Sequence, residues 1–302
     1  MVDTATTHPA TATRPPGRPG KAAGPQGGRL EIPLLGLLRE RPEYVLSPLL
    51  FVVLIAIWHA AAVIFEPPEF ILPPPGMVWS ALVSGLSASP FDPSGFWYHA
   101  GVTAFEALSG FLIGSGAGIT IGMAVAHSRL VERVLYPYII AIQSLPKIAV
   151  APLFVIWFGF GIEPKILITT IITFFPLLVN SIAGANSVDP ARIDLARSCN
   201  ATPMQIFFKI TLPSALPFIF AGLNMAAVLS ILGAIVGEFV GAQAGIGMLI
   251  LQRNELLDIA SVYALFVVLA AMGLSLHLTM RALERHFCFW SHRGRKADLD
   301  SV

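Results

Sequence analysis

Six long apolar runs, almost free of charge, limit what this chain of 302 residues can fold into. A helix that crosses a bilayer needs about 20 mostly apolar residues, and each run is that long. Lys147 is the one formally charged residue in any of them. The runs do not alternate apolar with polar residues, as barrel strands do. The sequence therefore predicts an all-α, polytopic membrane protein with six transmembrane helices, over Val45–Phe65, Ala107–Ala126 (with a start near Ala100), Val134–Phe160, Ile166–Ala185, Leu216–Gly237 and Ile259–Met280.

The composition agrees with a chain whose solvent is the lipid bilayer. Hydrophobic residues make up 55% of the chain and charged residues only 12%, about half the charged share of an average soluble domain. The net charge of +1 gives no reason to expect a nucleic acid partner. The two cysteines and seven histidines show no metal-binding spacing, so we expect no metal and no cofactor.

The basic residues fall on one side of the predicted spans. Of 19 Lys and Arg residues, 16 lie in the N-terminal tail, the 127–133 loop, the 186–213 loop and the C-terminal tail, whereas the 66–99 loop has none. The positive-inside rule then places both termini in the cytoplasm, with the chain in the cell's inner (plasma) membrane. We expect three parts: a disordered cytoplasmic tail over 1–42, a transmembrane domain over 43–285 and a cytoplasmic tail over 286–302.

A row of glycines marks one face of the second span. Gly110, Gly114, Gly118 and Gly122 recur every four residues, so they share one side of a helix and let a neighbouring backbone approach closely. This pattern favours tight packing inside a bundle. A seam between two copies of the chain is the alternative.

The third span carries three prolines, Pro137, Pro146 and Pro152. Each proline lacks a backbone donor, so it kinks or breaks a helix. A broken helix at membrane depth is tolerated where it is buried in protein or lines a cavity. We expect the break to hold residues of the transport pathway, and the candidates there are Gln143, Ser144 and Lys147.

Lys147 lies near the middle of the bilayer, where a lysine facing lipid costs about 2.5–3.5 kcal/mol on insertion scales. It should therefore face the interior of the bundle. Two roles stay open. Lys147 either pairs with Glu106, with Glu238 or with carbonyls freed by the proline, or it lines the pathway, where a two-fold dimer would present two positive charges to a solute.

The stretch VGEFVGAQAGIGMLI, from residue 236, contains four glycines and does not favour a long straight helix. We expect the fifth span to end near Gly237 and an irregular segment to follow at the outer mouth. Glu238 would stand at that mouth as a gate or docking carboxylate. A structural ion pair is the other interpretation of Glu238.

Residues 187–217 form a charged, punctuated stretch between two apolar runs. Asp189 and Pro190 are typical of a helix start, and a helix is expected over 190–199. Asn200 follows, where a residue that tolerates left-handed φ is wanted. Thr202 then begins a capping box with Gln205. The second helix is expected to run to Thr211, with Pro213 marking its junction with the fifth span.

Two helices joined by an elbow resemble the cytoplasmic motif of the permease subunits of binding-protein-dependent ABC importers. That motif reads Glu-Ala-Ala, three residues, Gly, nine residues and Ile-x-Leu-Pro. Here the matching residues are Asp194, Leu195 and Ala196, then Asn200, then Ile210, Leu212 and Pro213. Asn for Gly keeps the geometry, because Asn also adopts left-handed φ. The segments LPPPGMVWSAL, LPKIAVAPLFVIWFGFG and VGEFVGAQAGIGMLI resemble the nitrate/sulfonate/taurine-type branch, which includes permeases for pyrimidine and vitamin precursors.

The resemblance implies partners and a mechanism. Two permease chains, here a second copy of this one, form the pathway, and ATPase subunits bind the coupling loop at about 187–213. A solute-binding protein outside the cytoplasm delivers a small polar or anionic organic solute, similar to a sulfonate, nitrate, taurine, pyrimidine or vitamin precursor. The chain has no G-x-x-x-x-G-K-[S/T] phosphate loop, so ATP hydrolysis is expected in a separate subunit.

Two other classes of protein remain as alternatives. An ion-gradient-driven secondary transporter usually shows internal repeats and paired charges near the midplane, and only Lys147 is a clear candidate here. A membrane enzyme would need a catalytic constellation. The sequence shows no HExxH, no Ser/His/Asp arrangement and no carboxylate pair at useful depth, so we expect no catalytic residues.

Overall fold

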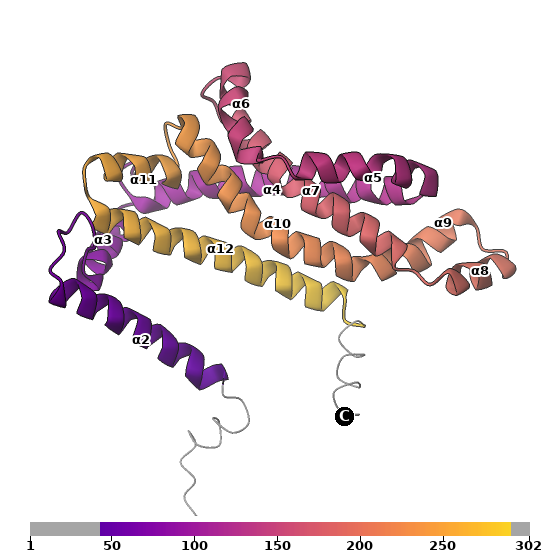
Figure 1. Ribbon diagram of the computed structural model, residues 1–302, viewed down its shortest axis with the longest axis horizontal. Coiled ribbons are helices and arrows are strands. Elements are labelled where there is room, and N and C mark those ends of the chain that lie inside the picture. Colours follow the sequence, from indigo (N-terminus) through magenta and orange to yellow (C-terminus); the bar gives the residue numbers. More distant parts are fainter. Residues whose placement is uncertain (1–42, 291–302) are drawn as a thin grey trace, which may run out of the picture. The chain divides into compact units, whose positions relative to one another are not determined.

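The computed structural model describes residues 43–290, and every regular element in that range is helical (Figure 1). Helix α2 (Glu43–Ile64) crosses the boundary between two compact units, after Ile55, and the second unit holds all later elements. These are α3 (Pro75–Ser87), α4 (Phe96–Ala126), α5 (Arg129–Gln143), η1 (Lys147–Val150), α6 (Ala151–Phe158), α7 (Glu163–Asn186), α8 (Pro190–Ser198), α9 (Pro203–Ile206), η2 (Phe207–Thr211), α10 (Leu212–Gly241), α11 (Ile246–Glu255) and α12 (Ile259–Phe287).

Five helices are long and apolar enough to cross a membrane, and a bent pair brings the number to six if it forms one span. The all-α polytopic fold is thus confirmed, but the third predicted span is not one helix. Helices α5 and α6 meet at 76° across a short break. Pro146 stands at this break, before η1, whereas Pro137 lies inside α5 and Pro152 in the first turn of α6. Of the three prolines, only Pro146 therefore coincides with the break. Pro152 removes no hydrogen bond, because an N–H in the first turn has no partner within its own helix.

Two helices differ from the sequence prediction on the N-terminal side. The 66–99 segment was expected to be a loop, but it contains α3, whose Val78 is buried against α12. Thirteen residues are too few to span a bilayer, so a search for spans overlooks such a helix. Helix α4 begins at Phe96 rather than near Ala100. The predicted 1–42 tail and residues 291–302 lie outside the described residues.

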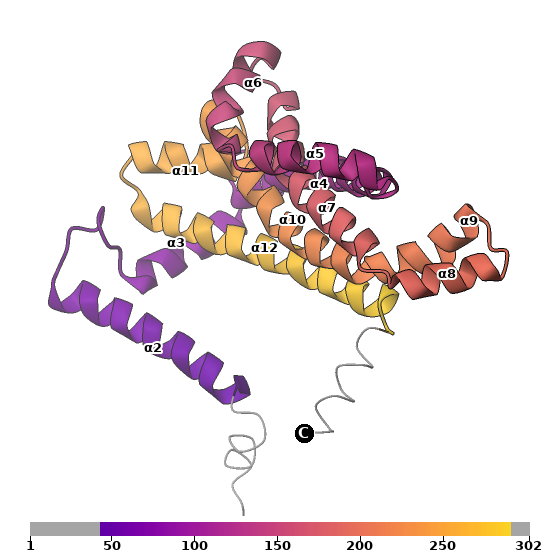
Figure 2. The same cartoon turned by 45° about the vertical axis from the view of Figure 1, so that its right-hand side comes forward.

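Helices α4, α7 and α10 pack side by side in the second unit (Figures 1 and 2). The glycine row of α4 faces α7. A Cβ added at Gly114 or Gly118 would stand 2.5 or 2.6 Å from a backbone carbonyl oxygen of α7. Gly110 and Gly122 meet the same helix. The row therefore serves packing inside the bundle, as the sequence favoured.

The α4–α7 contact predicts opposite outcomes for two glycines of one helix. Gly118→Ala should lower the free energy of unfolding by about 1–3 kcal/mol, because its methyl group would meet the carbonyl of Phe174. Gly116→Ala is the matched control, because its Cβ meets nothing within 4 Å and alanine favours a helix. Thermal unfolding in detergent measures both. Equal stability of the two variants would contradict this packing.

Candidate functional site: the elbow, the broken helix and a buried polar cluster

The first helix of the elbow begins and ends as the sequence predicts. The Asp189 carboxylate accepts the backbone N–H of Ala191 at 2.9 Å, and Pro190 occupies the first turn of α8. Beyond the end of α8, Asn200 adopts a φ of +57°. The N–H of Ala201 then donates to the Ala196 carbonyl at 3.0 Å, which closes the turn. The left-handed elbow at Asn200 is confirmed.

The second helix begins with the predicted capping box. The N–H of Gln205 donates to Thr202 Oγ1 at 3.3 Å, and Gln205 Oε1 accepts the N–H of Thr202 at 2.8 Å. Its predicted end at Thr211 is wrong, and Pro213 does not punctuate a junction. One continuous helix runs from Pro203 to Gly241. The π turn of η2 widens the helix just before Pro213, which shifts the hydrogen-bond register where a donor is missing.

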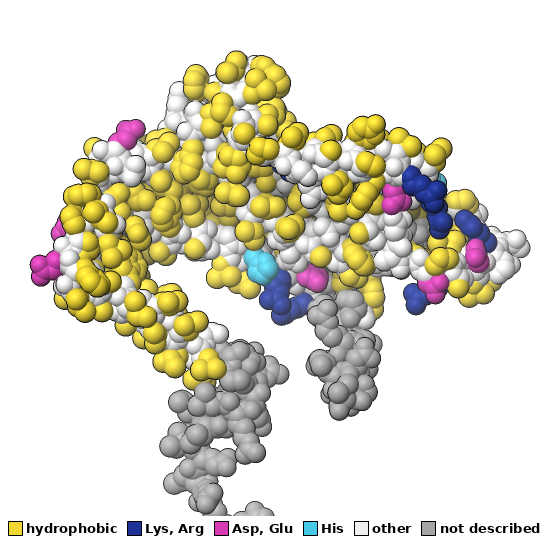
Figure 3. Space-filling model, viewed as in Figure 1, with side chains coloured by type: hydrophobic (Ala, Val, Ile, Leu, Met, Phe, Trp, Pro, Cys, Tyr) yellow, Lys and Arg dark blue, Asp and Glu magenta, His cyan; other side chains and the backbone are white. Residues whose placement is uncertain are grey.

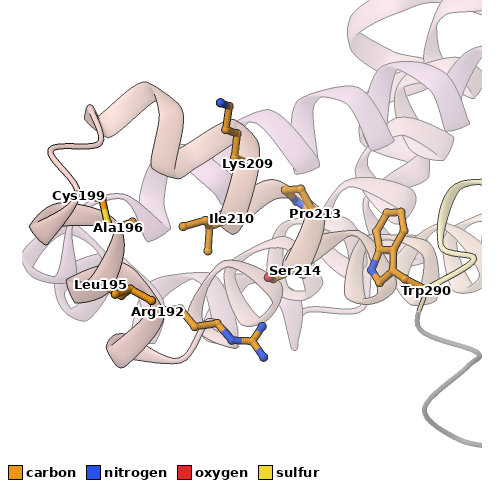
Figure 4. A pocket seen from close by; sticks show the side chains of 9 residues that line it. All are labelled: Arg192, Leu195, Ala196, Cys199, Lys209, Ile210, Pro213, Ser214 and Trp290. Carbon is orange, nitrogen blue, oxygen red and sulfur yellow. The ribbon is translucent and has the colours of Figure 1, made fainter.

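The elbow presents most of the predicted motif on its surface. Leu195 is 67% exposed, and Asp194 forms an exposed ion pair with Arg197 at 3.5 Å. Leu212 points the other way and packs against the bundle core. A hollow of about 370 Å³ lies between α8 and the start of α10, and Figure 4 shows the side chains that line it: Arg192, Leu195, Ala196, Cys199, Lys209, Ile210, Pro213, Ser214 and Trp290.

The elbow conformation predicts how Asn200 can be replaced. Asn200→Gly should be tolerated, since glycine accepts a φ of +57° without strain. Asn200→Val should be destabilising by about 1–3 kcal/mol, because a β-branched residue is strained there. Limited proteolysis of the 187–213 segment in the membrane-embedded protein compares the two variants. Equal resistance of Asn200→Val and the wild type would show that the left-handed turn is not needed.

Lys147 stands at the break between α5 and α6. Its ammonium donates to the Gln143 carbonyl at 2.6 Å and lies 5.1 Å from the centre of the Phe175 ring. Gln143 is the last residue of α5, so its carbonyl has no N–H partner within that helix, and the lysine satisfies it. Of the predicted partners, the carbonyl is confirmed. The predicted pairing of Lys147 with the carboxylate of Glu106 or Glu238 is wrong, because Glu106 binds Lys165 and Glu238 binds Thr103.

The other pathway candidates flank the same break. The Gln143 side-chain oxygen Oε1 is buried and receives no hydrogen bond from the described part of the chain. The Ser144 hydroxyl donates to the Ile140 carbonyl at 2.9 Å, inside its own helix. An apolar cavity of about 100 Å³ adjoins the break and is lined by Ile142, Leu145, Lys147, Val150, Phe154, Ile168, Ile171 and Phe175.

The sequence missed an ion pair inside the bundle. Lys165 of α7 donates to Glu106 of α4 at 2.8 Å, and the two residues are only 6% and 1% exposed. The expectation that Lys147 is the one clear charge within the spans is therefore wrong. The signal was present at the span edges. Glu106 and Lys165 directly precede the apolar runs that begin at Ala107 and Ile166, so the runs were cut at the charges.

Glu238 belongs to the same buried cluster. Helix α10 ends at Gly241 rather than near Gly237, and an irregular segment follows as expected. Glu238 is 1% exposed and accepts hydrogen bonds from the Thr103 hydroxyl, at 2.6 Å, and from the N–H of Gly247. Thr103, which binds Glu238, lies three residues before Glu106 on α4, so the two carboxyl groups belong to one buried cluster. The expectation of no carboxylate pair at depth is thus wrong, and Glu238 is not a partner in an ion pair.

Helices long enough to cross a membrane, packed through glycines and joined by an exposed two-helix elbow, define a component of a membrane transporter. A family comparison specifies which kind. The family described as "Binding-protein-dependent transport system inner membrane component" matches residues 114–287. The chain belongs to this family, so it is a multi-pass inner-membrane permease of an ABC importer. The sequence-based assignment is confirmed, and the secondary-transporter alternative gains no support.

Curated relatives match the chain over most of their length. A probable ABC transporter permease protein of Haemophilus influenzae is 33% identical over 82% of this chain and 98% of its own. The riboflavin transport system permease protein RibX of Chloroflexus aurantiacus is 34% identical over 87% and 92%. The putative aliphatic sulfonates transport permease protein SsuC of Bacillus subtilis is 31% identical over 83% and 90%.

A solved structure supports the fold. The MetNI methionine ABC transporter, in an inward-facing conformation, contains a chain that matches with a TM-score of 0.52 and 20% identity. The match covers 70% of this chain and 98% of that one. Among residues 43–290, no three His, Cys, Asp or Glu side chains are grouped as a metal site.

Proposed function

We propose that this permease works as one of two copies, driven by separate ATPase subunits that bind the elbow at 187–213, and passes a solute delivered by a solute-binding protein. The observation that carries the proposal is the elbow itself. Two helices with their own caps, Asp189 and Thr202, stand outside the bundle and keep Leu195 exposed. An ordinary loop between two spans needs no such rigid, apolar-tipped unit.

The distribution of exposed charge supports the proposed sidedness. Figure 3 shows basic side chains over α8, the start of α5 and the end of α12. The positive-inside rule favours a cytoplasmic position for that end, and an even number of spans would put both termini on the same side of the membrane. The exposed basic residues on it are Arg129, Arg133, Arg192, Arg197, Lys209, Arg281 and Arg285, whereas the opposite helix ends expose Glu66, Glu69, Asp92, Glu163 and Glu255.

The broken helix is the proposed solute pathway. Lys147, Gln143 and Ser144 lie where the backbone of the third span is interrupted, and such interruptions line cavities or are buried in protein. Gln143 offers an acceptor without a donor, and Lys147 offers positive charge beside aromatic side chains. Glu238, as a gate or docking carboxylate, remains a candidate. In the described conformation it is closed off from solvent.

The solute we propose is small, organic and polar or anionic. The names of two relatives mention riboflavin, a flat heterocycle, and aliphatic sulfonates, which are anions. A cation at the broken helix suits an anionic or strongly polar group, and the neighbouring Phe175 and Phe154 suit an apolar or flat body.

Reconstitution tests the coupling role of the elbow. Proteoliposomes holding the permease, its ATPase and its binding protein should take up solute only with ATP. Ala196→Trp should break the link between hydrolysis and uptake, because a bulky side chain fills the hollow beside α8. Ala60→Trp, in the exposed part of α2, is the control and should leave uptake unchanged. Uptake driven by a sodium or proton gradient without ATP would contradict the proposal.

Lys147→Met separates a structural from a pathway role. The lysine binds a carbonyl and not a buried carboxylate, so its loss strands no charge. We expect normal amounts of folded protein and ATPase assembly, with uptake of an anionic solute reduced at least tenfold. Lys147→Arg, which keeps the charge, should retain more uptake than Lys147→Met. A fall in folded protein with normal uptake per molecule would favour the structural role.

A further inference from the structure

The N-terminus of α11 is capped from a distance. Gly245, the residue before the helix, provides no side chain, so the first N–H groups need other acceptors. The N–H of Gly245 donates to His99 Nδ1 at 3.0 Å and that of Ile246 to Thr103 Oγ1 at 2.8 Å. The N–H of Gly247 donates to Glu238 Oε2. Side chains of α4 and α10 thus replace the missing local cap and fix the turn over 242–247.

The carboxyl oxygens beneath this cap are unequally satisfied. Glu238 Oε1 accepts the hydroxyl of Thr103 and Glu238 Oε2 the N–H of Gly247. Glu106 Oε1 accepts from Lys165. Glu106 Oε2 is buried and receives no donor. Two neighbouring carboxyl groups can form a hydrogen bond only if one of them carries a proton, and Glu106 Oε2 is the oxygen that has no donor.

The balance of charge in the cluster also indicates that one carboxyl group is protonated. Two ionised carboxylates and one ammonium would leave a net negative charge among groups that are all at least nine-tenths buried. Such an uncompensated charge is expensive in a low-dielectric interior, and neighbouring acids avoid it by retaining a proton. Within residues 43–290, no further ion pair reaches Glu106, Glu238 or Lys165. His99 is neutral, because Nδ1 accepts from Gly245 and Nε2 then donates to the Pro93 carbonyl, and Arg253 of α11 pairs with Asp258.

We infer that Glu106 and Glu238 hold one proton between them, placed on Glu106 Oε2 and donated to Glu238. This proton completes the hydrogen-bond network that holds the N-terminus of α11. The cluster is then neutral and every carboxyl oxygen has a hydrogen-bond partner. Glu238 stays an acceptor for both of its donors, so it acts as a positioning residue for the 242–247 turn. The inference depends on the buried contacts alone and not on the proposed solute or partners.

Infrared spectroscopy of the full chain in lipid nanodiscs tests the bound proton. At neutral pH the wild type should show the carbonyl stretch of a protonated carboxylic acid, shifted in heavy water. Glu106→Gln and Glu238→Gln should each abolish this band. In either variant the charges of the remaining carboxylate and the Lys165 ammonium cancel, so the cluster has no need to retain a proton. Lys165→Met should strengthen it, since two acids without the ammonium retain two protons. A wild type without the band, or a band that survives in either Gln variant, overturns the inference.

Thermal unfolding of the same variants tests the role in positioning. Glu106→Gln should melt close to the wild type, because its amide donates to Glu238 and still accepts from Lys165. Glu238→Gln should melt lower, because the amide has a single acceptor oxygen for Gly247, and Thr103 has to turn its hydroxyl to the more distant His99 carbonyl, at 3.1 Å. The wild type should also lose stability as the pH rises from the acid range towards neutrality, because the unfolded carboxyl gives up a proton that the folded state keeps, and Glu106→Gln should lose less. A Glu238→Gln variant as stable as Glu106→Gln would overturn the positioning role.

Discussion

The close approach of α4 to α7 is the contact on which the rest of the second unit depends. In lipid no hydrophobic effect brings helices together, so their association depends on van der Waals contact between closely packed backbones. The glycine row supplies it, and the Thr173 hydroxyl reaches the Gly110 carbonyl across the gap at 3.3 Å. This approach also brings Glu106 within 2.8 Å of Lys165. A larger side chain in the row would separate both the backbones and the ion pair.

A single helix connects the two ends of this bundle. From Pro203 to Gly241 it runs for 39 residues, about 58 Å at 1.5 Å per residue. One end carries the capping box of the elbow and the other carries Glu238 in the polar cluster. A displacement of the elbow by the ATPase that we propose to bind there would therefore act on the same helix that holds α11. The π turn at Phe207–Thr211 is the one irregular place along it, and lies next to the elbow.

Local signals were readable from the sequence because neighbouring residues decide them. Asp189, Asn200 and Thr202 set a cap, a left-handed turn and a capping box within a few residues, and all three have the predicted geometry. The polar cluster could not be found in this way. Its partners are 59 residues apart for Glu106 and Lys165 and 135 residues apart for Thr103 and Glu238, so only the packed helices bring them together.

The extent of the helices was hard to predict for a related reason. Apolar runs stop at charged residues, but a buried charge with a partner allows the helix to continue. Glu106 therefore lies well inside α4, and α10 continues past Glu238 to Gly241. Proline was misleading in the opposite direction. Pro213 was expected to mark the junction of two helices, yet the helix continues through it, and the π turn just before it shifts the hydrogen-bond register where the donor is missing.

The central claim, that an ATPase binds the elbow from the cytoplasm, can be tested with a native probe. Cys199 is exposed at the end of α8, whereas Cys288 is buried, and burial raises the pKa of the Cys288 thiol, which lowers its reactivity. A membrane-impermeant maleimide should label Cys199 of a Cys288→Ser variant in inside-out vesicles and not in right-side-out vesicles. Assembly with the ATPase should protect it. Labelling from the outer face, or labelling unchanged by the bound ATPase, would contradict the account.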